Sequence, residues 1–132
     1  MKSIMVVDDS LMMRISLKKL FEKNGFEVVA EAVNGLDAIE KYSKFQPDLT
    51  TLDITMPVMD GIATLQEIVK IDRGACVVMI SALGQERKII ESIKAGAKHY
   101  IQKPINESHA IDVIRSVLNL DEEEMPDACC VR

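Results

Sequence analysis

Five short apolar segments alternate along the chain with longer segments whose apolar residues recur at helical spacing. The apolar segments lie at residues 4–7, 27–32, 49–52, 76–82 and 100–102. Runs of this length are typical of buried strands, and the second, which carries acids, suits the edge of a sheet. The alternation predicts an α/β domain in which helices cover both faces of a parallel sheet.

The helices are expected in the segments between these strands. They run from Leu11 to about Asn24, from the Asn34-Gly35 turn to about Phe45, from Ile62 to near Ile71, from Gln85 to Ala95, and from about Glu107 to Asn119. Ser10 is expected to cap the first helix, and Gly25 and Gly96 are expected to end the first and the fourth.

Apolar residues at helical spacing predict which helix faces turn inward. For the second and fourth helices these residues are Ala38, Tyr42, Phe45, Ile89, Ile90 and Ile93. Thr50 and Thr51 place hydroxyl groups in the otherwise apolar third strand. We expect one of these hydroxyls to bond to the backbone, because a buried polar group is costly without a partner.

Polar side chains stand where four of the predicted strands end. They are Asp8 and Asp9 after the first strand, Asp53 after the third, Ser81 in the fourth and Lys103 after the fifth. In a parallel sheet these ends lie along one edge, which is where ligands bind. A carboxylate there can hold a cation or act as a nucleophile toward a phosphoryl group.

Each of these residues has an ordinary structural explanation when it is taken alone. An acid pair before a helix is often a cap, a serine after a strand is often a loop hydroxyl, and a lysine is usually solvated. Asp60, which precedes Gly61, is better explained as a turn or cap residue. Separate ordinary explanations would all have to hold at four strand ends. One shared site explains the same residues more simply.

Four short motifs resemble the receiver domain of two-component response regulators. They are Asp-Asp-Ser at residues 8–10, Asp-Ile-Thr-Met-Pro-Val-Met-Asp-Gly at 53–61, Ser-Ala at 81–82, and Lys-Ala-Gly-Ala at 94–97 followed by Lys103-Pro104. Their order and spacing match that family from about Lys2 to Leu120. Within the family, the segments around Asp53 and Ser81 are most similar to the stand-alone chemotaxis regulators.

The pattern and this resemblance together predict a flavodoxin-like (βα)5 three-layer sandwich. Its five parallel strands are expected in the order 2-1-3-4-5, because right-handed crossovers leave few topologies. Residues 1–120 would form the receiver domain, and residues 121–132 an acidic, disordered tail. We expect no effector domain after Leu120, and we therefore expect the output to be contact with another protein.

The resemblance also implies a chemistry for the predicted site. Asp53 would accept a phosphoryl group from a histidine kinase, and Ser81 and Lys103 would contact the phosphoryl oxygens. Mg²⁺ would be held by Asp8, Asp9, Asp53 and the backbone carbonyl of Thr55, because this ion prefers oxygen ligands. Without the ion, clustered carboxylates would repel one another and raise at least one pKa.

The family further implies a switch and a surface for partners. Tyr100 would turn inward when Ser81 moves toward the phosphoryl group, which would alter the face made by the fourth helix, fifth strand and fifth helix. Partner contacts expected on this face are Lys88, Ser92, Tyr100 and Glu107. The expected target is a flagellar motor switch, and the resemblance implies a cis peptide between Lys103 and Pro104.

Composition adds few constraints. The net charge of the 132-residue chain is -5, and residues 121–132 contribute most of it, so nothing indicates a nucleic-acid interface. Three cysteines do not make a disulfide framework. No apolar run approaches the roughly 18 residues of a membrane span. We therefore expect a cytoplasmic monomer that does not bind membranes.

Three alternatives stay open at this point. The receiver could be a phosphorelay intermediate that passes its phosphoryl group to a histidine phosphotransferase. It could be a turnover phosphatase with an aspartyl-phosphate intermediate, although many of these place a second acid where this chain has Thr55. It could be a flavin-binding module, although Asp8 and Asp9 would repel the flavin phosphate. We favour a regulator that catalyses only its own phosphotransfer and dephosphorylation.

Overall fold

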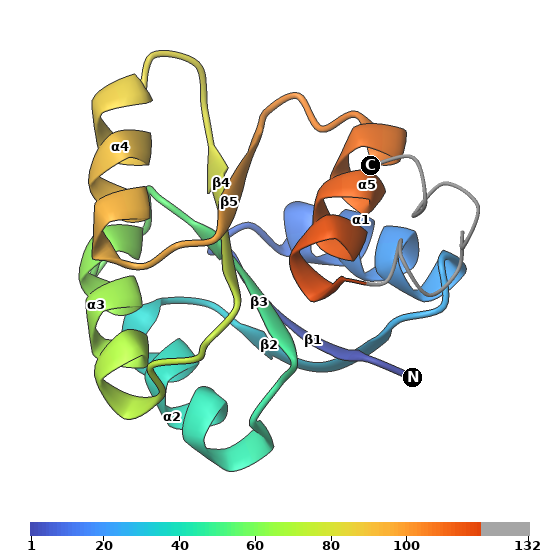
Figure 1. Ribbon diagram of the computed structural model, residues 1–132, viewed down its shortest axis with the longest axis horizontal. Coiled ribbons are helices and arrows are strands. Elements are labelled where there is room, and N and C mark those ends of the chain that lie inside the picture. Colours follow the sequence, from blue (N-terminus) through green and yellow to red (C-terminus); the bar gives the residue numbers. More distant parts are fainter. Residues whose placement is uncertain (120–132) are drawn as a thin grey trace.

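The computed structural model describes residues 1–119, in which strands and helices alternate (Figure 1). The elements are β1 (Ser3–Val7), α1 (Leu11–Lys23), β2 (Glu27–Ala32), α2 (Gly35–Phe45), β3 (Leu49–Asp53), α3 (Gly61–Ile71), β4 (Val77–Ser81), α4 (Glu86–Ala95), β5 (His99–Gln102) and α5 (Glu107–Leu118). The expected tail at residues 121–132 lies outside the described residues.

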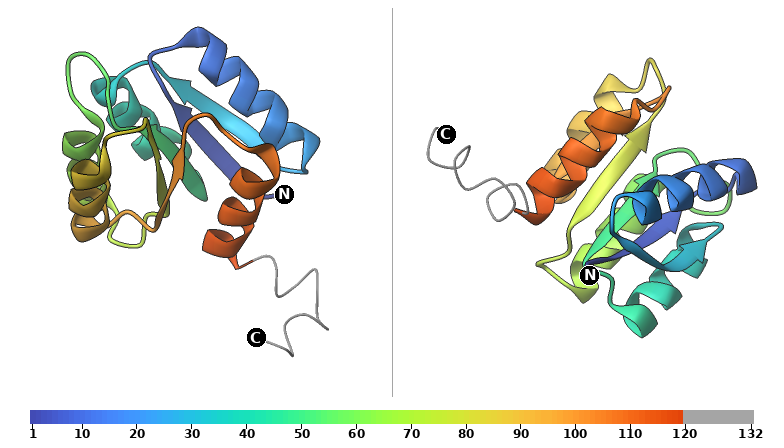
Figure 2. Two further views of the ribbon diagram at one scale, coloured as in Figure 1. Left: turned by 90° about the horizontal axis from the view of Figure 1, so that it is seen from above. Right: turned by 90° about the vertical axis from the view of Figure 1, so that its right-hand side faces the viewer.

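All five strands are parallel and follow the order β2-β1-β3-β4-β5, which confirms the predicted topology. Helices α1 and α5 cover one face of the sheet, and α2, α3 and α4 cover the other (Figure 2). The three central strands, β1, β3 and β4, are therefore buried on both sides, with a separate apolar core on each face of the sheet. β2 lies at the edge, as its acids predicted.

Four of the five described helices begin with a side-chain cap. Ser10, Asn34, Asp60 and Asn106 each accept a hydrogen bond from the backbone N–H three residues later. Such caps satisfy amide groups that have no partner within the helix. The cap residue of α4 is Gln85, and its side chain does not cap the helix.

Of the three isoleucines predicted to face inward from α4, only Ile89 packs against the core. Ile90 and Ile93 are 55% and 44% exposed, whereas Ser92 is fully buried and its hydroxyl donates to the carbonyl of Lys88 at 2.7 Å. A methyl group added at Gly96 would lie 3.1 Å from the side chain of Val69. The face toward α3 thus carries small residues, because the helices approach closely, and Ser92 is not available as a partner contact.

Two further predictions about buried groups were wrong. Phe45, the last residue of α2, is 42% exposed, and the centre of its ring lies 5.3 Å from the ammonium group of Lys44. Thr50 and Thr51 are fully buried on opposite faces of β3, and neither hydroxyl has a hydrogen-bond partner among the described residues. The neighbouring strands already occupy the backbone groups that these hydroxyls could have used.

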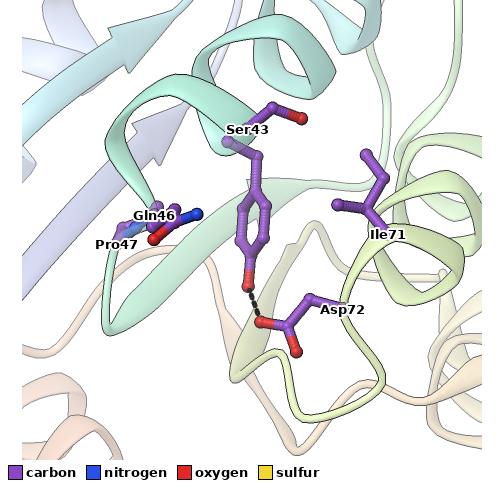
Figure 3. A pocket seen from close by; sticks show the side chains of 6 residues that line it. Ser43, Gln46, Pro47, Ile71 and Asp72 are labelled. Carbon is purple, nitrogen blue, oxygen red and sulfur yellow. Dashed lines mark hydrogen bonds between the residues drawn. The ribbon is translucent and has the colours of Figure 1, made fainter.

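A pocket of about 360 Å³ lies between the C-terminal ends of α2 and α3 (Figure 3). Within it the hydroxyl of Tyr42 donates to Asp72 at 2.8 Å. Helix ends of this kind lie at the amino ends of the strands, so this pocket is at the opposite edge from Asp53. Among residues 1–119, no helix combines the length and the apolar character needed to cross a membrane.

Candidate functional site

Three carboxylates converge at the carboxyl edge of the sheet. Asp8 and Asp9 stand in the loop after β1, Asp53 ends the adjacent β3, and one oxygen of each lies within 4.8 Å of the others. Asp8 is 1% and Asp53 is 6% exposed, whereas Asp9 is exposed to solvent. The strand order brings these acids together, because β1 and β3 are direct neighbours.

The backbone of Asp8 is held on both sides. Its N–H donates to the carbonyl of Ala32 at 3.1 Å, and its own carbonyl accepts from Nη1 of Arg14 at 2.8 Å. Its carboxylate oxygen Oδ1 accepts from the N–H of Ser10 at 2.9 Å. Arg14 also pairs with Glu31 of β2 at 3.2 Å. The acid loop is thus fixed to α1 and to the edge strand.

Asp53 is positioned by the loop that follows it. The N–H of Thr55 donates to Oδ1 of Asp53 at 3.2 Å, and Gly61 donates to the carbonyl of Ile54 at 2.7 Å. A side chain at Gly61 would collide with the backbone of Asp53 and Ile54. Only glycine therefore lets α3 begin this close to the backbone that carries Asp53.

Lys103 is the cation of this edge. Its Nζ lies 3.5 Å from Oδ2 of Asp53 and 4.0 Å from Oδ2 of Asp8. Its backbone N–H donates to the carbonyl of Ser81 at 2.7 Å, which ties the end of β5 to the end of β4. The peptide between Lys103 and Pro104 is cis, as the resemblance implied.

Burial and charge shape the protonation of the two buried acids. Burial raises the pKa of both Asp8 and Asp53. The negative charge of Asp53 raises the pKa of Asp8 further. Lys103 acts in the opposite direction and lowers both pKa values, and the N–H groups of Ser10 and Thr55 do likewise. The expected rise in pKa is present, but burial contributes more to it than repulsion.

The donor set fits a hard divalent cation. The residues offer carboxylate oxygens from two strands, and Oδ2 of Asp8 is buried without a hydrogen-bond donor among residues 1–119. Buried carboxylates of this kind are stable as anions only when a cation balances them. The nearby hydroxyl of Ser81 is also buried and has no hydrogen-bond partner in the described part of the chain.

The expected partner contacts lie on three neighbouring elements. Lys88 is exposed on α4, Tyr100 is 39% exposed on β5, and Glu107 is exposed at the start of α5. Glu107 lies 3.9 Å from Lys23 of α1. Ser92 does not belong to this surface, as described above.

Two residues near the site were missed by the sequence analysis. Arg14 holds the carbonyl of Asp8, and Gln85 bridges two loops beside Asp53. The only signal for Arg14 was its position one turn after the Ser10 cap. No sequence signal marked Gln85, because its contacts depend on how two distant loops meet.

The family model of the response regulator receiver domain matches residues 4–115, and the chain belongs to this family. It is 51% identical to the chemotaxis protein CheY of Bacillus subtilis (strain 168) over 116 residues, or 88% of this chain and 97% of that protein. It is 47% identical to CheY of Thermotoga maritima with the same coverage.

The solved structures agree with this family. The CheX-CheY-BeF3-Mg complex from Borrelia burgdorferi matches with a TM-score of 0.85 and 38% identity, covering 89% of both chains. The chain is a receiver domain closely related to the chemotaxis response regulators, which are phosphorylation-activated signalling proteins rather than classical enzymes. Nothing in the comparisons supports the phosphorelay or phosphatase alternatives.

Proposed function

We propose that Asp53 accepts the phosphoryl group by which this receiver is activated. An oxygen of the Asp53 carboxylate attacks the phosphorus of a phosphohistidine on a kinase, and the P–N bond breaks toward the imidazole nitrogen. The observation that carries this proposal is the position of Lys103, 3.5 Å from the Asp53 carboxylate at a buried acidic edge. The same chain would later lose the group by hydrolysis.

Asp8, Asp9, Asp53 and the backbone carbonyl of Thr55 are the proposed ligands for Mg²⁺. A bound Mg²⁺ would neutralise charge on the incoming phosphoryl oxygens. Lys103 would form an ion pair with one of these oxygens, and the unpaired hydroxyl of Ser81 would donate to another. These two contacts would come from different strands, because Ser81 ends β4 and Lys103 directly follows β5.

Incubation with acetyl phosphate and Mg²⁺, followed by intact-mass measurement, tests the acceptor. The native chain should gain one phosphoryl group, and Asp53→Asn should gain none. Asp60→Asn is the matched control, because Asp60 caps α3 and asparagine caps equally well. A phosphoryl group found on Asp53→Asn, or lost in Asp60→Asn as well, would contradict the assignment.

The output is proposed to be contact with a protein target through α4, β5 and α5. Tyr100 would turn inward after phosphorylation, and Lys88 and Glu107 would flank the contact surface. In this proposal residues 1–120 act as one receiver unit, and the chemotaxis target is a flagellar motor switch. The structure of the Borrelia CheY relative with CheX shows that such a relative can bind another protein.

Competition between two baits tests this target. A motor-switch peptide and a phosphotransferase domain are titrated with the chain, with and without beryllofluoride and Mg²⁺. Binding to the peptide should strengthen with beryllofluoride and should weaken in Lys88→Ala. Lys19→Ala, on the exposed face of α1, should bind like the native chain. Strengthening only for the phosphotransferase domain would favour a relay instead.

A further inference from the structure

The side chain of Gln85 joins two loops beside the acidic edge. Its carbonyl oxygen Oε1 accepts from the backbone N–H of Ala82 at 2.7 Å, and its Nε2 donates to the hydroxyl of Thr55 at 2.7 Å. Ala82 directly follows Ser81, and Thr55 is two residues beyond Asp53. The bridge therefore connects the ends of β4 and β3 on either side of the proposed phosphoryl position.

The N–H of Ala82 points toward the site, as the geometry of the peptide requires. The carbonyl of Ser81 accepts from Lys103 on the β5 side. In a trans peptide the C=O and the following N–H point in opposite directions. The N–H of Ala82 is thus directed to the β3 side, where Asp53 and Thr55 lie, and Gln85 occupies it there.

The side chain of Gln85 does not cap the helix that it precedes. Gln85 is the cap residue of α4, yet its amide group makes no capping bond, whereas the other four described helices have side-chain caps. The start of α4 is therefore tied to the acidic edge rather than to its own first turn. Gly84, at φ +87°, allows the loop to turn sharply just before it.

We infer that Gln85 is a positioning residue that competes with the phosphoryl group for the N–H of Ala82. This rests on Asp53 being the acceptor. Each phosphoryl oxygen can accept more than one contact, so Lys103, Ser81 and Mg²⁺ would not use all of its acceptor sites. The N–H of Ala82, which directly follows β4, is the next backbone donor after Ser81. A charged oxygen accepts a hydrogen bond more strongly than an amide oxygen, so phosphorylation displaces Gln85.

Displacement has a consequence for α4. Once its Oε1 is released, Gln85 also loses the arrangement that holds its Nε2 on Thr55. The bridge is broken at both ends, and the first turn of α4 is freed from the β3–α3 loop. The state of Asp53 is thereby transmitted to the start of a helix that forms part of the proposed output face.

Beryllofluoride affinity in Mg²⁺ tests the competition. Gln85→Ala removes both bonds of the bridge, and Thr55→Val removes the bond that holds Gln85 in place. Each variant should therefore bind the phosphoryl mimic about threefold to tenfold more tightly than the native chain. The double variant should bind no more tightly than either single variant, because the same bridge is lost. Leu83→Ala, exposed in the same loop, should match the native affinity.

Amide exchange at Ala82 supplies a readout that a purely structural role would not move. The Ala82 N–H should exchange slowly in the native chain, rapidly in Gln85→Ala, and slowly again in that variant once beryllofluoride is bound. Equal affinities in all variants, or additive effects in the double variant, would overturn the role of Gln85 while leaving Asp53 as acceptor. A native chain that binds no beryllofluoride would overturn both.

Discussion

The hydroxyls of Thr50 and Thr51 lie fully buried in the central strand without hydrogen-bond partners among residues 1–119. A buried hydroxyl that has lost water and gained no partner destabilises the folded state. Valine has nearly the same shape and no polar atom. Thr51→Val should therefore raise the free energy of unfolding by about 1 kcal/mol, as measured by urea denaturation.

Thr64 provides the matched control for this prediction. It is equally buried, but its hydroxyl donates to the carbonyl of Asp60 at 2.9 Å at the start of α3. Thr64→Val should lower the free energy of unfolding by about 1 kcal/mol. If both substitutions shift stability in the same direction, an unpaired hydroxyl is not what distinguishes Thr51.

The residues of the acidic edge could be predicted because each ends a strand. Asp8, Asp9, Asp53, Ser81 and Lys103 were all found by this rule, and the structure brings them to one edge. Gln85 and Arg14 could not be predicted in this way. Their contacts are set by the rotation of a helix and by the meeting of two loops, which leave no periodic trace in the sequence.

At the scale of the elements, the start of α3 presses against the strand that carries Asp53. A side chain at Gly61 would collide with the backbone of Asp53 and Ile54. Gly61→Ala should lower the free energy of unfolding by about 2 kcal/mol. It should also weaken Mg²⁺ binding, because the strand end that carries Asp53 must shift. Urea denaturation measures the loss of stability, and calorimetry measures the weaker Mg²⁺ binding.

Gly74 is the control for this substitution. It precedes β4 at the opposite edge of the sheet, and the nearest atom to an added methyl group is 3.5 Å away, an ordinary contact. Gly74→Ala should leave Mg²⁺ affinity unchanged and stability within about 0.5 kcal/mol. Equal losses at both positions would show that helix propensity or chain entropy, not the collision, governs Gly61→Ala.

Element bounds were predicted well, but helix faces were not always. The strand bounds followed from apolar runs, and Ser10 and Gly25 marked the ends of α1 correctly. The face of α4 was misassigned because size rather than hydrophobicity decides it. Ser92 is fully buried and Gly96 lies close to Val69 of α3, whereas Ile90 and Ile93 are exposed. Apolar periodicity does not detect such close approaches.

At the scale of the whole molecule, the topology places two acidic strand ends side by side. β1 and β3 are adjacent although β2 lies between them in the sequence. Helices on both faces keep the ends of β1 and β3 dry enough for burial to raise the pKa of Asp8 and Asp53. The ionised carboxylates of Asp8 and Asp53 therefore lower the stability of the folded state. The size of this loss depends on pH and on bound cations.

The sign of the pH dependence follows from the direction of these pKa shifts. Between the ordinary carboxyl pKa and the raised one, the folded state binds more protons than the unfolded state, so stability falls as pH rises. Asp53→Asn removes one such acid. Without metal, this variant should be more stable than the native chain near neutral pH.

This advantage of Asp53→Asn should shrink as pH falls toward about 4, where the unfolded chain is also protonated. Urea denaturation in a chelator across this range measures it, and Asp60→Asn shows the effect of removing an exposed acid. An advantage that stays constant with pH would mean that Asp53→Asn acts through packing rather than through the buried charge.

Mg²⁺ should reverse this cost, because a ligand that binds only the folded state stabilises it by mass action. At a hundredfold excess over its dissociation constant the gain is about 2.7 kcal/mol. Asp8→Asn should lose most of this increment, since Asp8 is both buried and a proposed ligand, whereas Asp60→Asn should keep it. Thermal unfolding with and without the ion measures the difference. An equal gain in Asp8→Asn would show that the cation binds elsewhere on this acidic chain. No gain in the native chain would show that the acids of β1 and β3 do not bind the proposed ion.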